Sequence, residues 1–132
     1  MKTQLSTFLT FQENNAEAAM NFYISLFADS KVIDIHRYGK EGPGKEGSVM
    51  IATFELNGKA FRCSDSFVRH NWTFTPAISI WVDCKDENEQ ATLFAKLSEN
   101  GSVYMPLNNY GFSRQFGWVG DRFGVTWQLN LA

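Results

Sequence analysis

The stretch QFGWVGDRFGVTWQLNL, residues 115–131, decides the predicted fold. Phe116 and Trp118 alternate with small or polar residues, and this period of two predicts a strand. Asp121 and Gly124 then predict a tight turn, because aspartate bonds to nearby backbone N–H groups and glycine tolerates positive φ. Beyond the turn, four apolar residues share one face of a second strand: Val125, Trp127, Leu129 and Leu131. The stretch therefore predicts a β-hairpin.

The opposite face of that second strand carries Thr126, Gln128 and Asn130. A polar face opposite an apolar one ordinarily contacts solvent. These three side chains are uncharged hydroxyl and amide groups, which also line concave, partly buried ligand pockets. Both interpretations are open from the sequence.

The composition indicates one domain with a substantial core. A chain of 132 residues with 15% aromatic residues supplies large side chains for burial. The formal charge of -2, with both signs interspersed, makes nucleic acid an unexpected partner. No apolar run reaches membrane-spanning length and no signal peptide is recognisable, so we expect a cytoplasmic protein. Cys63 and Cys84 have no metal-site spacing and are predicted to be packed free thiols.

The first half of the chain predicts a strand, a helix and three strands. The apolar period changes from two to that of a helix at Ala16, with Asn15 as the expected N-cap. Asn57 and Gly58 form a strong hairpin signal. The expected strands cover residues 5–11, 31–38, 48–56 and 59–65, and the expected helix covers residues 16–28.

The glycine- and lysine-rich segment GKEGPGKEG, residues 39–47, has the composition of a phosphate-binding loop. Such a loop opens a helix, whose N-terminal N–H groups face the anion. The residues that follow, 48–56, are typical of a strand. We therefore predict an ordinary connecting loop.

The second half repeats the order of the first. Residues 86–89 predict a helix N-terminus with a capping box, and Asn100-Gly101 predicts the end of that helix. The expected strands cover residues 78–83, 102–107, 113–120 and 125–131. The chain thus reads as two β-α-β-β-β units, about 1–66 and 75–132, in one domain of residues 1–132.

This repeat resembles the vicinal-oxygen-chelate superfamily, also called the glyoxalase/bleomycin resistance/dioxygenase superfamily. The segments AEAAMNFYISLF (16–27), FELNG (54–58), FTPAISIWV (74–82) and FGWVGDRFGVTWQ (116–128) are similar to its PhnB-like branch, whose members often carry a demethylubiquinone methyltransferase-like label. The resemblance implies an α+β fold in which two units form a curled mixed sheet around a cleft, with the helices outside. It also implies a homodimer.

The label alone does not indicate methyl transfer. Conventional methyltransferases that use S-adenosylmethionine have a parallel sheet and a glycine-rich turn after the first strand, whereas residues 12–15 here are Gln-Glu-Asn-Asn. Metal-dependent relatives place His or Glu ligands on strands facing the cleft. If Leu5 and Ile78 face the helices with their alternating neighbours, the cleft positions carry no ordinary metal ligand: Ser6, Phe8, Thr10, Ala77, Ser79 and Trp81. The final strand has Gln128 where active relatives often have Glu.

We therefore predict a metal-free protein without a cofactor that binds an apolar or aromatic small molecule with one anionic group. The candidate ligand-binding residues are Phe8, Asp65, Ser79, Trp81, Tyr110, Arg114, Trp118 and Gln128. Aromatic rings would form the walls, and Arg114 would pair with the anionic group. The alternative is a lyase, isomerase or dioxygenase that binds Zn²⁺, Ni²⁺, Mn²⁺ or Fe²⁺ through Asp65, His70 and Gln128. The catalytic residues and the ligand are not predicted.

Overall fold

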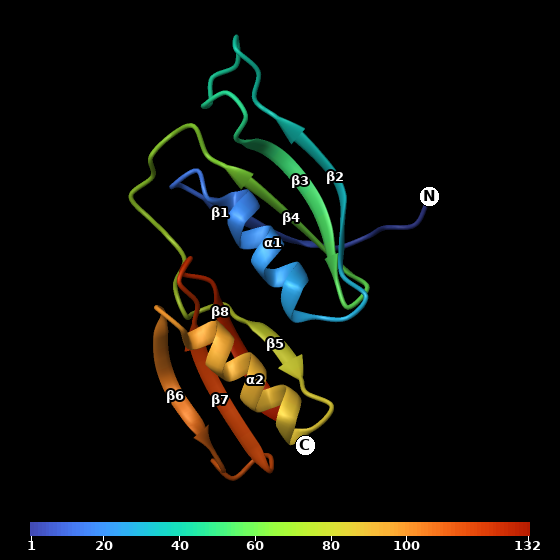
Figure 1. The fold of residues 1–132 in the computed structure, drawn as a ribbon, viewed down its shortest axis with the longest axis vertical. Coiled ribbons are helices and arrows are strands. Elements are labelled where there is room, and N and C mark those ends of the chain that lie inside the picture. Colours follow the sequence, from blue (N-terminus) through green and yellow to red (C-terminus); the bar gives the residue numbers. More distant parts are fainter. The chain divides into compact units, whose positions relative to one another are not determined.

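Each half of the chain folds as a strand, a helix and three further strands (Figure 1). The computed structural model describes residues 1–132, which divide into a first unit, Met1–Asn71, and a second unit, Trp72–Ala132. The first unit contains β1 (Thr7–Phe11), α1 (Ala16–Leu26), β2 (Lys31–Arg37), β3 (Val49–Leu56) and β4 (Lys59–Asp65). The second contains β5 (Ile80–Asp83), α2 (Glu87–Ser98), β6 (Ser102–Asn108), β7 (Gln115–Gly120) and β8 (Thr126–Leu131).

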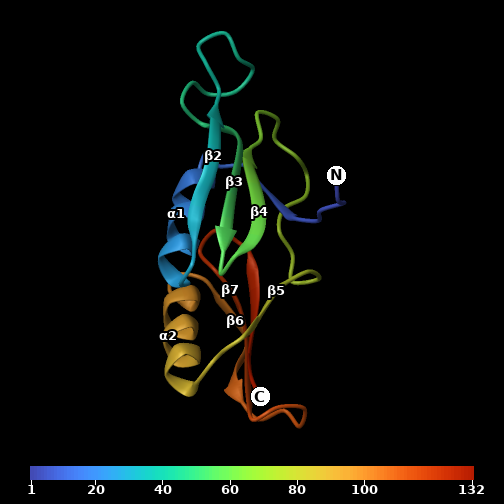
Figure 2. The same ribbon diagram turned by 90° about the vertical axis from the view of Figure 1, so that its right-hand side faces the viewer.

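The two units have the same sheet topology. The strand order is β1-β4-β3-β2 in the first sheet and β5-β8-β7-β6 in the second. The first strand of each unit pairs in parallel with the last, and the remaining pairs are antiparallel. Within each unit the helix covers one face of its own sheet (Figure 2). We call the other face of each sheet its open face. The predicted α+β fold and repeated unit order are confirmed.

The core of each unit lies between its helix and its sheet. Apolar residues on alternating strand positions are buried there, as the period of two requires. In the first unit these residues are Leu9, Phe11, Phe54, Phe61 and Cys63, and in the second Val119, Trp127, Leu129 and Leu131. The helices contribute Ala16, Ala19, Met20 and Tyr23 from α1, and Leu93 and Leu97 from α2.

The two helices are capped in different ways. Asp86 is the predicted N-cap of α2, and its carboxylate accepts a hydrogen bond of 2.8 Å from the Glu89 N–H. Asn15 occupies the N-cap position of α1, but its side chain makes no capping bond. The Ala16 N–H instead donates to Asp65 Oδ1, 49 positions away, at 2.9 Å. A capping prediction from local sequence cannot detect such a distant acceptor.

The hairpin of residues 115–131 is built around Asp121. Oδ1 of this buried carboxylate accepts hydrogen bonds from the Phe123 and Val125 N–H groups, and Oδ2 accepts one from Trp127 Nε1 at 2.9 Å. Gly124 has φ of 96°, a conformation that favours glycine. The predicted turn is confirmed, and its aspartate also anchors a core tryptophan.

Several element boundaries differ from the prediction, and three of them affect which residues face the helices. The first strands of the two units begin at Thr7 and Ile80, so Leu5 and Ile78 lie before them and are 91% and 78% exposed. The expectation that both face a helix is wrong, because strand pairing begins only two residues later in each case. Helix α1 ends at Leu26 rather than near residue 28.

Both cysteines are buried free thiols, as predicted. Burial raises the pKa of Cys63 to about 12 and that of Cys84 to about 11, so neither forms the reactive thiolate readily. The segment 39–47 leads into β3 and not into a helix, as expected of an ordinary loop. No helix of the chain has the length and apolar character needed to cross a membrane.

Candidate functional site

A row of three large side chains crosses the open face of the second sheet. Trp81 on β5 pairs with Gln128 on β8, and Gln128 pairs with Trp118 on β7. Directly paired residues point to the same face of a sheet. The core residues Trp127 and Leu129 flank Gln128 and point to the helix, so the row lies on the opposite side. Three of the predicted ligand-binding residues are therefore brought together.

Aromatic rings extend this row around Phe116. The ring of Phe116 lies 5.8 Å from that of Trp81, 6.1 Å from Tyr110 and 5.0 Å from Phe112, measured between centroids. Phe116 is buried, whereas Phe112 is 60% exposed, Trp81 49% and Tyr110 37%. We call these four residues the Phe116 cluster. It offers flat apolar surface that is partly open to solvent.

Hydroxyl groups continue the open face next to Trp118. The Trp118 indole N–H donates to Ser79 Oγ at 3.1 Å, and Ser79 Oγ lies 2.7 Å from Thr126 Oγ1. Thr126 Oγ1 donates in turn to the Ile78 carbonyl at 2.7 Å. The predicted residue Ser79 thus lies beside the aromatic row and fixes the orientation of Trp118.

A second polar group lies at the other end of β5. Asp83 Oδ1 accepts hydrogen bonds from Trp81 Nε1 at 2.9 Å and from Asn130 Nδ2 at 3.1 Å. These bonds favour the ionised carboxylate and lower the pKa of Asp83. Asn130 Oδ1 is buried and has no hydrogen-bond partner. Thr126 and Asn130 are buried and Gln128 is half-buried, so this face of β8 is less exposed than a solvent-facing strand.

The equivalent row on the first sheet has a different chemistry. Phe8 on β1 pairs with Arg62 on β4, and Arg62 pairs with Thr53 on β3. Arg62 Nη1 donates to Thr53 Oγ1 at 2.6 Å. Phe8 is 48% exposed and occupies the position that Trp81 has in the second unit. The first open face therefore presents one ring and one cation.

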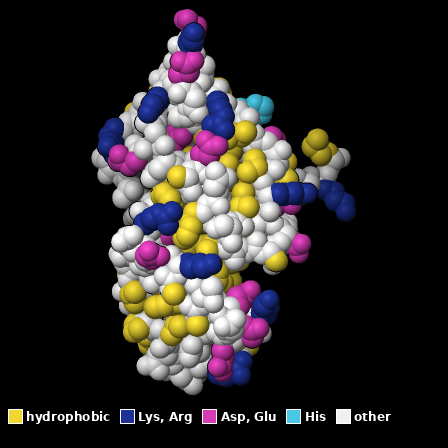
Figure 3. Space-filling view, viewed as in Figure 1, with side chains coloured by type: hydrophobic (Ala, Val, Ile, Leu, Met, Phe, Trp, Pro, Cys, Tyr) yellow, Lys and Arg dark blue, Asp and Glu magenta, His cyan; other side chains and the backbone are white.

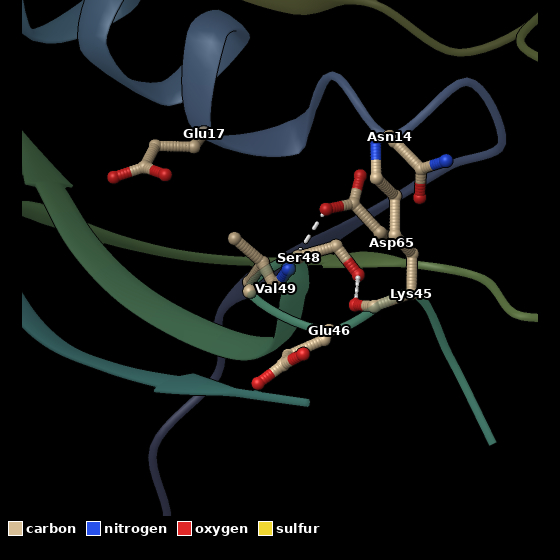
Figure 4. Close-up of a pocket in the computed structure, with 8 residues that line it drawn as sticks. Asn14, Glu17, Lys45, Glu46, Ser48, Val49 and Asp65 are labelled. Atoms are coloured by element: carbon tan, nitrogen blue, oxygen red, sulfur yellow. Dashed lines mark hydrogen bonds between the residues drawn. The ribbon is translucent and has the colours of Figure 1, made fainter. Parts of the chain in front are cut away.

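Asp65 lies on the helix side of the first sheet, away from Phe8. Its carboxylate accepts hydrogen bonds from the Ala16 N–H at 2.9 Å and the Val49 N–H at 2.8 Å. Asp65 is one of the residues that line a polar cavity (Figure 4), whose volume is about 280 Å³. The cavity is lined by Asn14, Glu17, Lys45, Glu46, Gly47, Ser48, Val49 and Asp65. This placement differs from the expectation of a cleft-facing carboxylate: Asp65 joins α1, β3 and β4.

The remaining candidates lie in connections. Tyr110 Oη donates to the Pro106 carbonyl at 2.6 Å, which holds its ring in the Phe116 cluster. Arg114 is exposed immediately before β7 and forms no ion pair. His70 Nε2 lies 3.0 Å from Ser66 Oγ, and its backbone N–H donates to Gln12.

The donor groups do not fit a divalent-metal site. No group of three or more His, Cys, Asp or Glu side chains is arranged to hold a metal ion. The strands of the second sheet contain a single acidic residue, Asp83, and no histidine or cysteine. In the alternative set, Asp65 already binds two backbone N–H groups. We derive no reaction step through a metal.

Sequence reasoning missed Phe116, Phe112 and Asn130. Phe116 was detectable, because it lies two positions before Trp118 on the same face of one strand. Asn130 was recognised as a polar-face residue, but its pairing with Asp83 depends on strand register, which the sequence does not give. Phe112 lies in an irregular connection and carries no periodic signal.

Two mixed four-stranded sheets, each with one helix, define an α+β protein of the glyoxalase/bleomycin resistance type. A family profile described as 3-demethylubiquinone-9 3-methyltransferase matches residues 3–130. The chain belongs to this PhnB-like family. No curated protein matches the chain in sequence.

Solved structures agree with this assignment. The PhnB protein from Bacillus cereus is 54% identical, with a TM-score of 0.94 over 98% of this chain and 100% of the other. Protein PA1353 from Pseudomonas aeruginosa is 26% identical, with a TM-score of 0.84 over 98% of each chain. The fosfomycin resistance protein FosX from Listeria monocytogenes is 9% identical, with a TM-score of 0.60 over 100% of this chain and 94% of the other, and shares the fold.

Proposed function

We propose that this protein binds a small aromatic molecule on the open face of its second sheet, without a metal ion. The observation that carries the proposal is the Phe116 cluster next to the row Trp81, Gln128 and Trp118. Ligand sites combine apolar and aromatic walls with a few polar groups that fix orientation. Ser79, Gln128 and Asn130 supply such groups here. Phe8 and Arg114 are also predicted to contribute to ligand binding. The cytoplasmic location remains a prediction.

The family description refers to methyl transfer, but the sheet topology and the connection from β1 to α1 favour binding of a small molecule without methyl transfer. The connection from β1 to α1 contains no glycine, and each sheet has one parallel pair. Neither feature resembles the cofactor-binding turn of a conventional S-adenosylmethionine-dependent methyltransferase. Methyl transfer is therefore not part of the proposal.

We also propose that the protein is a homodimer. In the second unit, hydrophobic side chains gather over the edge strand β6 (Figure 3). Val103 and Tyr104 of this strand are 50% and 44% exposed. Exposed apolar edges are common in contacts between subunits. Light scattering of the purified protein gives its mass, and Val103→Lys should shift a dimer towards monomer. A monomeric wild-type protein would contradict this part of the proposal.

The indole N–H groups allow a direct test of ligand binding. Trp81 and Trp118 lie on the second open face, whereas Trp127 is buried on the helix side of the same sheet. In ¹H–¹⁵N spectra, titration with 2-methoxynaphthalene should shift the signals of Trp81 and Trp118. The Trp127 signal serves as an internal control for the core and should move less. Absence of shifts at Trp81 and Trp118 with this probe and with 2-naphthol would overturn the proposal.

Metal content tests the rival enzyme function. The protein is incubated with Zn²⁺, Ni²⁺, Mn²⁺ or Fe²⁺, dialysed extensively and analysed by inductively coupled plasma mass spectrometry. We expect less than stoichiometric retention of every ion. Retention of one ion per chain would contradict the metal-free proposal and favour the alternative set of Asp65, His70 and Gln128.

A further inference from the structure

The proposed binding surface contains a buried hydrogen-bond acceptor without a donor. Asn130 is 9% exposed, and its Oδ1 atom has no partner. The orientation of its amide is fixed by the other end, because Nδ2 donates to Asp83 Oδ1 at 3.1 Å. An unsatisfied buried acceptor costs free energy, and a ligand donor that reaches it recovers that cost. The atom of Asn130 that can form a further hydrogen bond is therefore the acceptor Oδ1.

This acceptor lies beside the aromatic surface. Asn130 pairs directly with Phe116, whose ring contacts Trp81, Tyr110 and Phe112. Phe112 is 60% exposed and its ring lies 5.0 Å from that of buried Phe116, so displacement of this exposed ring would uncover Phe116. A planar ligand resting on Phe116 would then place a substituent near Asn130.

The negative charge near Asn130 disfavours ligands with an anionic group at this position. Asp83 is ionised at neutral pH, because hydrogen bonds from Trp81 and Asn130 lower its pKa. An anionic substituent near Asn130 would face both this carboxylate and the amide oxygen. Arg114 is the nearest cation in sequence to β7, but it is exposed and forms no ion pair with Asp83. The polar groups beside this aromatic surface therefore favour a donor over an anion.

We propose that the ligand is a planar aromatic molecule with a hydroxyl or amino donor, and that Asn130 Oδ1 accepts the hydrogen bond from that donor. This inference rests on the proposed function and specifies its ligand class. It replaces the earlier expectation of an anionic group held by Arg114. No bond is made or broken, and the step is recognition only.

Three naphthalene probes of equal ring size separate the possibilities. 2-Naphthol carries a donor, 2-methoxynaphthalene carries the same oxygen without a donor, and 2-naphthoate carries an anion. Dissociation constants come from the shifts of the Trp81 and Trp118 indole signals. We expect 2-naphthol to bind about fivefold more tightly than 2-methoxynaphthalene, the typical net effect of one hydrogen bond. 2-Naphthoate should bind most weakly.

Asn130→Leu tests the acceptor itself. This variant should bind 2-naphthol and 2-methoxynaphthalene with equal affinity, while binding of 2-methoxynaphthalene is retained. The matched control is Asn88→Leu, which makes the same change on the exposed surface of α2 and should keep the fivefold preference. If Asn130→Leu does not fold, the comparison of the three probes on the wild-type protein still decides the inference.

The outcomes separate this inference from the proposed function. Equal binding of 2-naphthol and 2-methoxynaphthalene by the wild-type protein would overturn the donor class and leave the aromatic site intact. Tightest binding of 2-naphthoate would also overturn it and return the site to Arg114. Failure of all three probes to shift Trp81 and Trp118 would overturn the proposed function itself.

Discussion

The two units share one topology but carry different open faces. At equivalent positions, the first sheet has Phe8, Arg62 and Thr53, and the second has Trp81, Gln128 and Trp118. In the first row the arginine bonds to the threonine, which leaves a single ring exposed. In the second row two indole rings flank an uncharged amide. The same backbone plan therefore supports a polar face in one unit and an aromatic face in the other.

On the sides of the sheets that face the helices, the first unit has a charged residue where the second has an apolar one. The position at the end of β4 is Asp65, and the corresponding position of β8 is the apolar residue Leu131. Asp65 joins three elements of the first unit through backbone donors, whereas in the second unit a buried amide, Gln90 on α2, donates to the Gln115 and Leu129 carbonyls. Both units therefore use buried polar groups for stability, and Asn130 of the second unit, by our proposal, adds one that serves recognition.

The largest expected effect comes from Asp65→Ala. This change leaves the Ala16 and Val49 N–H groups buried without an acceptor, at a cost of about 2–5 kcal/mol in the free energy of unfolding. Urea denaturation measures the loss. Asp34→Ala on the exposed edge strand β2 is the matched control and should change stability by less than about 0.5 kcal/mol. Equal stability of the two variants would contradict the structural role of Asp65.

Removal of each of the two equivalent rings in turn compares the contributions of the two open faces to ligand binding. Trp81→Ala removes a ring that contacts Phe116 and should weaken 2-naphthol binding by roughly tenfold. Phe8→Ala removes the ring at the same position of the first unit and should weaken it by less. Thermal unfolding of both variants separates ligand effects from loss of the fold. Equal weakening would contradict the assignment of binding to the open face of the second sheet.

Titration with acid tests the two hydrogen bonds that the Asp83 carboxylate accepts. Its pKa is lowered in the folded protein, so the stabilising contribution of its ionised form is complete above the ordinary value of 3.8. The contribution is lost as the pH falls through the lowered pKa. We expect the Trp81 indole signal to shift in that acidic range, because its N–H then loses a charged acceptor. Asp83→Asn should remove the titration; an unchanged titration in this variant would contradict the assignment.

The smallest effect is expected for Gln128→Glu. The new carboxylate would join a face whose strands contain one other acidic residue, Asp83. We therefore expect weak binding of Zn²⁺ that does not survive dialysis, with the wild-type protein as the control in the same metal analysis. Stoichiometric retention by the variant would show that the other ligands of a metal site are already present.

Local patterns predicted most of the fold. Residues 115–131 contain their own strand periods and turn chemistry, so the hairpin could be predicted without any distant contact. The strand starts at Thr7 and Ile80 could not, because apolar alternation continues outward to Leu5 and Ile78 although pairing does not. The role of Asp65 depends on backbone donors far away in the sequence, and that of Asn130 on register.

The two buried cysteines allow the opening of each unit to be measured without any mutation. Cys63 belongs to the first unit and Cys84 to the second, and each thiol is protected by burial and a raised pKa. Opening of a unit exposes its own thiol to a thiol-specific reagent. Equal labelling rates are expected if the two halves open together as one cooperative unit. Unequal rates would give each half its own opening free energy, so the chain carries one natural reporter for each of its repeats.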